Sequence, residues 1–250
     1  MSQLGSFETA IKAVVIGASG GIGGALAEAL AADPRIDRIL ALARSGRTPA
    51  GPKLEAGRVD AEDEADVVAA AELARDRLGE IDLVLVATGV LQDEARGIRA
   101  ERTWQAIDPD AMARVLMTNT IAPALVLKHL LPLLARDRKS VAGVLSARVG
   151  SIADNRLGGW HSYRASKAAL NMLIRCFALE LRRRNPGALC IGLHPGTVDT
   201  PLSSPFQANV DETRLFTPAF AAERLLDVID RLGPEHTGGV FAWDGARIPE

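Results

Sequence analysis

The chain has 250 residues, 48% of them hydrophobic, and a formal net charge of −2. That length and apolar content predict one folded domain and exclude a disordered chain, and the near-neutral charge argues against a nucleic-acid partner or an anionic membrane. The two cysteines, Cys176 and Cys190, form no CxxC motif, so we expect no disulfide framework, no zinc site and a cytoplasmic location.

Short apolar runs alternate with longer alanine-rich stretches of helical period, which is typical of a parallel sheet covered by helices on both faces. Strands are predicted at residues 13–16, 38–43, 54–59, 81–87, 141–146, 189–194 and 239–243. Helices are predicted at residues 22–32, 62–77, 109–135, 163–183 and 218–231. The pattern predicts a single three-layer α/β domain over residues 1–250, with seven strands in one sheet. Two irregular stretches, residues 91–107 and 201–217, are long enough to cover a ligand.

A run of glycines follows the first predicted strand, in the stretch GASGGIGG. Gly17, Gly21 and Gly23 have the spacing G-x-x-x-G-x-G and precede the first predicted helix. Glycines at such positions permit a tight turn, and they let backbone N–H groups and the helix N-terminus approach a pyrophosphate. We interpret this segment as a nucleotide-binding turn, the alternative being a plain packing turn.

The second predicted strand ends at Ala43 and is followed by Arg44, Ser45 and Arg47. A site for NAD usually carries an acidic residue about 20 positions after the glycines, where it binds the ribose 2′-hydroxyl. Arg44 offers a cation there instead, and a guanidinium forms a charge-assisted fork with a 2′-phosphate. The sequence therefore predicts NADP(H) in preference to NAD(H), the alternative being a solvated arginine at a strand end.

Tyr163 and Lys167 are four residues apart in HSYRASKAAL, at the start of a predicted helix. Residues at i and i+4 lie on one helix face, with Cβ atoms roughly 6 Å apart. A phenol has an unperturbed pKa of about 10, and a nearby ammonium is expected to lower that pKa by stabilising the phenolate. The pair is therefore a candidate for proton transfer.

Five motifs together resemble the short-chain dehydrogenase/reductase family. They are the glycine turn, VDAEDE, MTNTIAP, YRASKAALN and HPGTVDTP, which occur in the family's order over almost the whole chain. Within the family, residues 145–171 and the ending FAWDGARIPE look most like the branch of the C-signal protein and the sniffer-type carbonyl reductases. The resemblance implies a Rossmann-type doubly wound fold, and an NADP(H)-dependent enzyme that reduces an aldehyde or ketone to an alcohol by hydride transfer.

The resemblance also implies roles for individual residues. Tyr163 would be the general acid that protonates the carbonyl oxygen, with Lys167 lowering its pKa and binding the nicotinamide ribose. Asn119 would hold a water that links Lys167 to solvent, unless it is only a helix residue satisfied by local backbone. Asp60 would accept a hydrogen bond from adenine, unless it is only the N-cap of the helix predicted from Glu62.

The expected catalytic set is Tyr163, Lys167, Asn119 and Ser146. The expected cofactor set is Gly17, Ser19, Gly20, Gly21, Ile22, Gly23, Arg44, Ser45, Asp60, Ala61, Ala87, Thr88, Gly89, Asn119, Tyr163, Lys167, Pro195, Gly196, Val198 and Thr200. Of these, the last four would border the nicotinamide.

The chain departs from the family pattern in the serine that binds the substrate carbonyl. Counting back from Gly150 places Ala147 at that position, with Ser146 one residue earlier and Ser151 just beyond. Adjacent side chains on a strand point to opposite faces, so Ser146 needs a bulge or a strand end to face the pocket. We assign the role to Ser146, with Ser151 in reserve. A third alternative is that Tyr163 binds the carbonyl alone.

Three further departures concern the surroundings of the site. Ile16 replaces the family's usual threonine, and the segment VATG replaces its Asn-Asn-Ala-Gly, keeping only Gly89. The segment between Gly150 and Tyr163 is also longer than in common members. Within it, Trp160 lines the substrate pocket or covers the core, and His161 is interpreted as a solvent-facing loop residue. With Pro205, Phe206 and Leu215, residues 201–216 predict a partly apolar lid.

Two functions are compatible with these motifs. The first is the carbonyl reductase, and the second is a signalling or regulatory protein in which NADP(H) occupancy controls association and turnover is incidental. A homo-oligomer, dimer or tetramer, is expected from the long apolar helices. Leu130, Leu131, Leu133 and Leu134 exceed what one helical stripe needs, unless they are buried within the monomer.

Overall fold

The central sheet has seven parallel strands in the order β3-β2-β1-β4-β5-β6-β9. The computed structural model describes residues 4–8, 10–209, 211 and 214–250. The strands of the sheet are β1 (Ile11–Ile16), β2 (Ile36–Ala43), β3 (Leu54–Arg58), β4 (Leu83–Val86), β5 (Ser140–Leu145), β6 (Ala188–His194) and β9 (Val240–Ala242). The strand order reverses between β1 and β4, and this switch point is where doubly wound folds bind ligands. The predicted seven-stranded sheet is confirmed.

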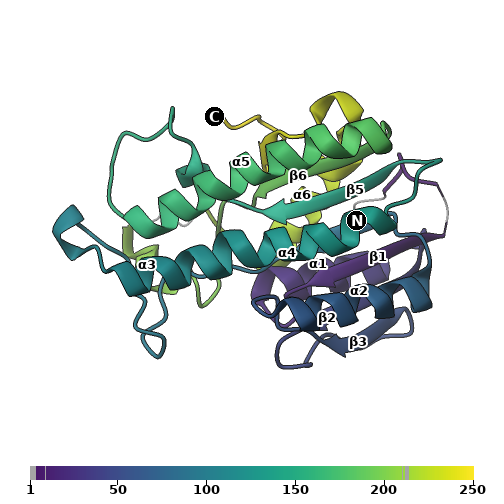
Figure 1. Ribbon diagram of the computed structural model, residues 1–250, viewed down its shortest axis with the longest axis horizontal. Coiled ribbons are helices and arrows are strands. Elements are labelled where there is room, and N and C mark those ends of the chain that lie inside the picture. The colour runs from purple at the N-terminus through teal and green to yellow at the C-terminus, as the bar shows by residue number, and fades with distance from the viewer. Residues whose placement is uncertain (1–3, 9, 210, 212–213) are drawn as a thin grey trace.

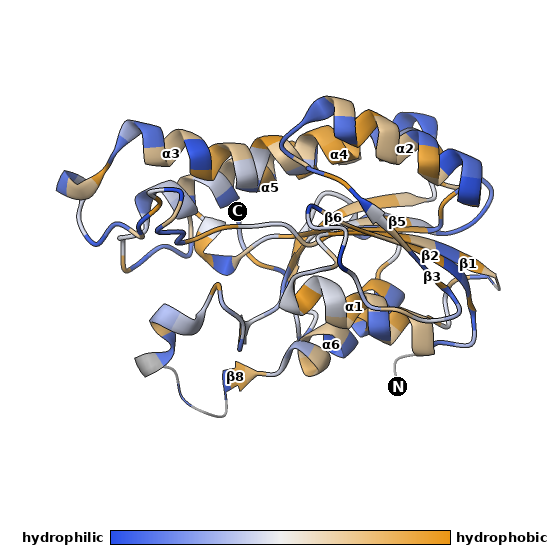
Figure 2. Ribbon diagram, turned by 90° about the horizontal axis from the view of Figure 1, so that it is seen from below, coloured by the Kyte–Doolittle hydropathy of each residue, from blue (hydrophilic) through white to orange (hydrophobic). Residues whose placement is uncertain are grey.

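Helices cover both faces of the sheet. They are α1 (Gly21–Ala32), α2 (Glu64–Leu78), α3 (Pro109–Leu116), α4 (Ala122–Leu130), α5 (His161–Arg184) and α6 (Pro218–Arg231). Figure 2 shows the sheet edge-on, with α2, α4 and α5 on one face and α1 and α6 on the other. The molecule therefore has the three layers and the Rossmann-type winding that the sequence predicts (Figure 1).

The two faces of the sheet bury separate apolar clusters. In β1, Val14 and Ile16 pack into the cluster beneath α2, α4 and α5, and Ala13 and Val15 pack into the cluster beneath α1 and α6. Successive side chains of a strand point to opposite faces. A strand covered on both faces therefore has to be apolar throughout, which explains the continuous apolar runs.

The predicted helix 109–135 is present as one helical stretch, Pro109–Leu133, whose hydrogen-bond pattern changes along its length. A π-helical turn, Met117–Ile121, joins α3 to α4, and a 3₁₀ turn, Leu131–Leu133, ends the segment. The stretch Pro109–Leu133 is long and apolar enough to span a membrane, but it packs against α2 and α5 as one layer of the domain. Its apolar face is thereby used inside the molecule.

The leucines that suggested an oligomer surface belong to the monomer's own core. Leu130 and Leu134 are buried, and Leu131 and Leu133 pack against the same cluster. For Leu130 and Leu134 the alternative, burial within the monomer, is confirmed, whereas Leu131 and Leu133 are only partly buried. The oligomeric state stays a prediction.

A second, two-stranded sheet joins the ends of the loop over the site. It pairs β7 (Thr197–Val198) with β8 (Leu215–Phe216) in parallel. Strands of two residues are too short to show a period in the sequence, so this sheet was not predicted. Of the predicted lid, residues 210 and 212–213 lie outside the described residues, and the rest includes a 3₁₀ segment, Ser204–Asn209.

Candidate active site

The carboxyl ends of the parallel strands enclose two adjoining cavities, of about 570 and 320 Å³. Both cavities are lined by Ser19 and Gly20, which follow β1, and by residues 87–90, which follow β4. The larger one extends toward α5 and the ends of β5 and β6, and the smaller one toward the ends of β2 and β3. The site therefore lies at the switch point of the sheet, as the doubly wound fold requires.

The glycines between β1 and α1 are required by close backbone contacts. Gly17 has φ +86°, a left-handed conformation that favours glycine. A Cβ on Gly23 would lie 2.2 Å from the carbonyl oxygen of Gly17, and one on Gly21 would lie 2.7 Å from a methyl of Thr200. Any side chain here would displace the turn or the segment facing it.

The N-terminus of α1 opens into both cavities without a competing acceptor. Its N-cap, Gly20, has no side chain, and its first turn contains no acidic residue. The first N–H groups and the positive end of the helix dipole are therefore available to an anion. The hydroxyl of Thr88 is also buried between the two cavities with no hydrogen-bond partner among the described residues. A pyrophosphate at the turn and a neighbouring polar group would satisfy both features, so these residues fit a dinucleotide.

The smaller cavity contains the residues predicted for the adenosine end. Arg44, Ser45, Asp60 and Ala61 all line it. Arg44 is exposed, and its guanidinium makes no hydrogen bond within the part of the chain that the structure describes. The guanidinium of Arg44 is therefore available to a ligand.

Asp60 is not the N-cap of the following helix. The helix begins at Glu64, and Asp63 caps it by accepting from the N–H of Ala65. Asp60 instead accepts from the N–H of Glu62 at 3.1 Å through one carboxylate oxygen, in an Asx-type turn at the mouth of the cavity. Its second oxygen can still accept from a ligand.

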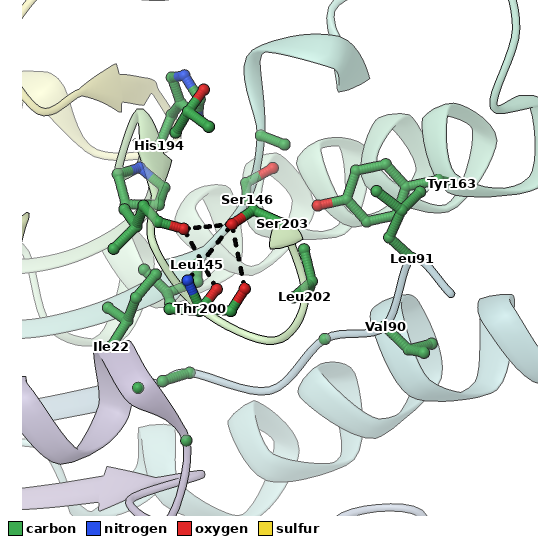
Figure 3. Close-up of a pocket in the computed structure, with 18 of the residues that line it drawn as sticks. Ile22, Val90, Leu91, Leu145, Ser146, Tyr163, His194, Thr200, Leu202 and Ser203 are labelled. Atoms are coloured by element: carbon green, nitrogen blue, oxygen red, sulfur yellow. Dashed lines mark hydrogen bonds between the residues drawn. The ribbon is translucent and has the colours of Figure 1, made fainter. Parts of the chain in front are cut away.

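The larger cavity contains Tyr163 and Lys167 from the first two turns of α5. In Figure 3 the hydroxyl of Tyr163 points from the helix into the space between Ser146, Leu202 and Leu91. Lys167 is buried, its Nζ lies 5.9 Å from the centre of the Tyr163 ring, and it donates to the carbonyl of Leu145 at 2.8 Å. The predicted pairing on one helix face is present.

The pKa of Tyr163 is shifted in the direction opposite to the one that the sequence predicts. Burial raises the pKa of Tyr163 to about 12, and burial lowers the pKa of Lys167 to about 8. Desolvation disfavours the charged form of each group, and it is the cause of both shifts. The phenol is therefore protonated at neutral pH, which suits a proton donor.

Tyr163 is the only tyrosine in the chain, so this pKa can be measured directly. We expect tyrosinate absorbance in the ligand-free protein to appear with a midpoint near pH 12, above the value of about 10 for a free phenol. The measurement is a rapid-mixing pH jump recorded before the protein unfolds, with Tyr163→Phe as the blank. A midpoint at or below that of a free phenol would contradict the effect of burial.

Asn119 lies in the π-helical turn, fully buried. Its Oδ1 accepts from the N–H of Val90 at 2.8 Å, and its Nδ2 donates to the carbonyl of Val90 at 2.8 Å and to the Ser166 hydroxyl at 3.0 Å. Ser166 in turn donates to the carbonyl of Tyr163. Asn119 thus joins the segment after β4 to α5, and its partners are distant in sequence rather than local.

The serines have different surroundings. Ser146 is buried at the edge of the cavity and donates to Oδ1 of Asn171 at 2.5 Å. Asn171 lies two turns beyond Tyr163 on α5. Ser151 is buried outside both cavities and accepts from the N–H of Asp154 at 3.0 Å. Ala147 lines the cavity with a methyl group, so the serine nearest the site already has a partner for its proton.

Trp160 lines the larger cavity, which decides between its two interpretations. Its ring packs edge-on against Tyr163, with centroids 6.4 Å apart, and against Phe206 from the lid, at 5.0 Å. His161 lies outside both cavities and is partly buried. It is the first residue of α5 rather than a loop residue, and its Nδ1 is buried without a partner among the described residues. Phe206 belongs to the cavity wall, as expected of a lid.

The structure brings together almost all of the predicted site. Every residue of the expected cofactor set lines one of the two cavities except Asn119, which lies outside both. Pro195, Gly196, Val198 and Thr200 face the larger cavity across from the glycine turn.

Sequence reasoning missed His194 and Arg148, which also line the larger cavity. Burial lowers the pKa of His194 to about 4, so the imidazole is neutral at pH 7, and its Nδ1 has no partner in the part of the chain that is described. The only signal for His194 was its position at the end of a strand, directly before Pro195 and Gly196.

The winding of the sheet, the glycine turn at the switch point and the two adjoining cavities define a Rossmann-type nucleotide-binding protein. The chain belongs to the short chain dehydrogenase family, whose model matches residues 12–211. The oxidoreductase class follows from that membership.

Similar proteins support the predicted branch. The C-signal of Myxococcus xanthus is 38% identical over 144 residues, which cover 57% of this chain and 81% of the relative. The 1-hydroxy-2-glutathionyl-2-methyl-3-butene dehydrogenase of Rhodococcus is 34% identical over 196 residues, covering 78% of this chain and 80% of the relative. The NADPH-bound carbonyl reductase from chicken fatty liver has a TM-score of 0.83 at 26% identity, covering 98% and 96% of the two chains. Other solved carbonyl reductases, Sniffer of D. melanogaster among them, share the fold.

Proposed function

We propose that this protein is an NADP(H)-dependent carbonyl reductase that converts an aldehyde or ketone to an alcohol. The observation that carries the proposal is the Tyr163 hydroxyl, which points into the cavity that also contains the glycine turn. The similarity to an NADPH-bound carbonyl reductase supports the same cofactor. When bound, the dinucleotide supplies a hydride to the carbonyl carbon.

The residues of the chain supply the rest of the reaction. Tyr163 binds the carbonyl oxygen through its O–H. It donates its proton to that oxygen as a hydride adds to the carbonyl carbon and the π electrons of the C=O bond move onto the oxygen. The ammonium of Lys167 stabilises the resulting phenolate. Asn119 keeps the helix that bears both residues aligned with the segment after β4. The apolar wall formed by Leu91, Trp160 and other side chains limits the access of water.

The test is NADPH consumption by the purified protein with a panel of aldehydes, ketones and quinones. We expect at least one substrate to be reduced with one NADPH consumed for each alcohol formed. A complete panel without NADPH consumption, from a folded protein that binds NADPH, would overturn the proposal.

A regulatory function is the second candidate, favoured by the similarity to C-signal. In that case biological function should survive Tyr163→Phe and be lost when Gly23→Ala closes the glycine turn, whereas a reductase loses function in both variants. The comparison separates the two proposals because only the first needs the phenolic proton.

Ser146→Ala is expected to lower kcat for carbonyl reduction by about fivefold, and Ser151→Ala by less than about twofold. Ser146 donates its proton to Asn171, so it has to rotate before it can bind a carbonyl, and the loss of one neutral hydrogen bond corresponds to about 1 kcal/mol. Steady-state kinetics of both variants on one carbonyl substrate measure this. A loss as large as that of Tyr163→Phe would instead make Ser146 an obligatory donor, and no loss in either variant would leave Tyr163 as the single donor.

A further inference from the structure

The N-terminus of α5 is held by a residue from a loop far away in sequence. Glu101 belongs to the irregular stretch 91–107, yet its side chain is buried. Its two carboxylate oxygens accept from the N–H of Ser162 at 3.2 and 3.3 Å, and one of them also accepts from the Ser162 hydroxyl. The backbone carbonyl of Glu101 accepts from the N–H of Trp160 at 2.6 Å. Glu101 therefore binds the first turn of the helix through both its main chain and its side chain.

This contact replaces a cap that the helix lacks. The N-cap of α5 is Trp160, which makes no side-chain capping hydrogen bond. The first N–H groups of a helix need acceptors, and a carboxylate there also interacts favourably with the helix dipole. A buried carboxylate is costly unless it is hydrogen-bonded, so its position at this helix end requires the contacts that it makes.

The chain entering the helix is strained in a way that needs such support. Gly158, Gly159 and Trp160 have φ of +65°, +67° and +50°, three consecutive residues in the left-handed region. A tryptophan in that region is a genuine outlier, and such conformations persist only where the surroundings determine them. The hydrogen bond from Trp160 to Glu101 is one of the contacts that hold it.

The catalytic tyrosine directly follows Ser162 and is three residues beyond the N-cap, Trp160. Tyr163 is the third residue of α5, and the Trp160 ring packs edge-on against the Tyr163 ring. A shift of the first turn would therefore move the phenolic hydroxyl both through the backbone and through the indole. Reacting groups misplaced by about 1 Å can cost about 100-fold in rate.

We propose that Glu101 is a positioning residue that sets the location of the Tyr163 hydroxyl in the cavity. It acts through Ser162 and Trp160, and it lies outside both cavities. The assignment rests on the proposed function for its kinetic consequence, but the position of the tyrosine can be measured without turnover.

The kinetic test compares Glu101→Ala and Glu101→Gln with Glu94→Gln, which changes an exposed carboxylate of the same loop. We expect Glu101→Ala to lower kcat for carbonyl reduction by about 100-fold, with the NADPH Kd and the carbonyl KM changed less than about threefold. Glu101→Gln keeps an acceptor for Ser162 and should lose only about tenfold. Glu94→Gln should match the wild type.

The second measurement is the NMR signal of tyrosine labelled with ¹³C at the ring Cζ. Because the chain has one tyrosine, one resonance reports Tyr163 alone. We expect it to shift or split in Glu101→Ala, to return toward the wild-type position in Glu101→Gln, and to stay unchanged in Glu94→Gln. Melting curves and NADPH binding identify variants that have failed to fold, and Glu101→Gln decides the question if Glu101→Ala does not fold.

An unmoved tyrosine resonance and an unchanged kcat in folded Glu101→Ala would overturn the proposal. So would a kcat that falls only in proportion to the folded fraction. If the wild type reduces no carbonyl compound, the reductase function fails, whereas a tyrosine resonance that moves as expected still supports the positioning role of Glu101.

Discussion

Tyr163→Phe is expected to lower kcat for NADPH-dependent carbonyl reduction by about 1,000-fold. The variant keeps the ring and its packing against Trp160 and removes only the hydroxyl that points into the cavity. General acids contribute typically about 100- to 10,000-fold to a rate. In the proposed mechanism, Tyr163 is the residue of this part of the cavity that donates a proton to the carbonyl oxygen. The measurement is the initial rate of NADPH consumption at saturating carbonyl substrate.

The NADPH dissociation constant is the control for this variant. It should change by less than about threefold, because the glycine turn and the adenosine cavity are untouched. A variant that binds NADPH normally and retains more than a tenth of the wild-type rate would remove Tyr163 from the mechanism. Loss of NADPH binding together with activity would point to a folding defect.

Arg44→Ala is expected to weaken NADPH binding by about 30-fold and to leave NADH binding within about twofold of the wild type. Hydrogen bonds to charged groups contribute about 1.5–3 kcal/mol, and about 1.4 kcal/mol corresponds to a tenfold change in Kd. Arg44 lines the smaller cavity, and a guanidinium there can form a fork with a 2′-phosphate. Isothermal titration with each cofactor measures both constants.

Arg47→Ala is the matched control, because Arg47 is an exposed arginine of the same segment that lies outside both cavities. It should leave NADPH binding within about twofold of the wild type. Equal affinity of the wild type for NADPH and NADH would contradict the predicted preference. An equal effect of both arginine variants would show that only the overall positive charge of the segment matters.

The two cofactor halves and the catalytic pair depend on different parts of the chain. The smaller cavity, where we expect adenosine, is lined by the ends of β2 and β3, whereas Tyr163 belongs to α5 on the other side of the glycine turn. The two large effects should therefore be separable: Arg44→Ala changes the binding of one cofactor, and Tyr163→Phe changes the chemical step. Sites without shared partners usually contribute additively, so the double variant should show both losses.

The Tyr163 pKa shows why a local motif is an incomplete guide to chemistry. The four-residue spacing correctly predicted that Tyr163 and Lys167 share a helix face. The pKa of a phenol, however, depends on how much water the surrounding elements exclude, and burial raises that of Tyr163 to about 12. In the proposed reaction, Lys167 acts when Tyr163 has given up its proton, because its ammonium then stabilises the Tyr163 phenolate.

The sequence by itself determined the class of fold, the glycine turn and most of the residues around the two cavities. Apolar runs, helical periods and the G-x-x-x-G-x-G spacing are local patterns, and backbone geometry ties each of them directly to a strand, a helix or a turn. The predicted ends of β4 were within two residues of the observed Leu83–Val86. A Cβ on Gly23 would lie 2.2 Å from the carbonyl oxygen of Gly17, so this position requires a glycine.

Only the tertiary structure decided the partners of individual side chains. Glu101 meets Ser162 across 61 positions of sequence, and Ser146 meets Asn171 across 25. Leu130 and Leu134 are buried on either side of a 3₁₀ turn that the helical period did not predict. The periodicity of the sequence shows which face of a helix or strand a residue occupies. Which side chains it contacts depends on how elements that are distant in sequence pack together. Burial, hydrogen-bond partners and pKa all follow from that packing.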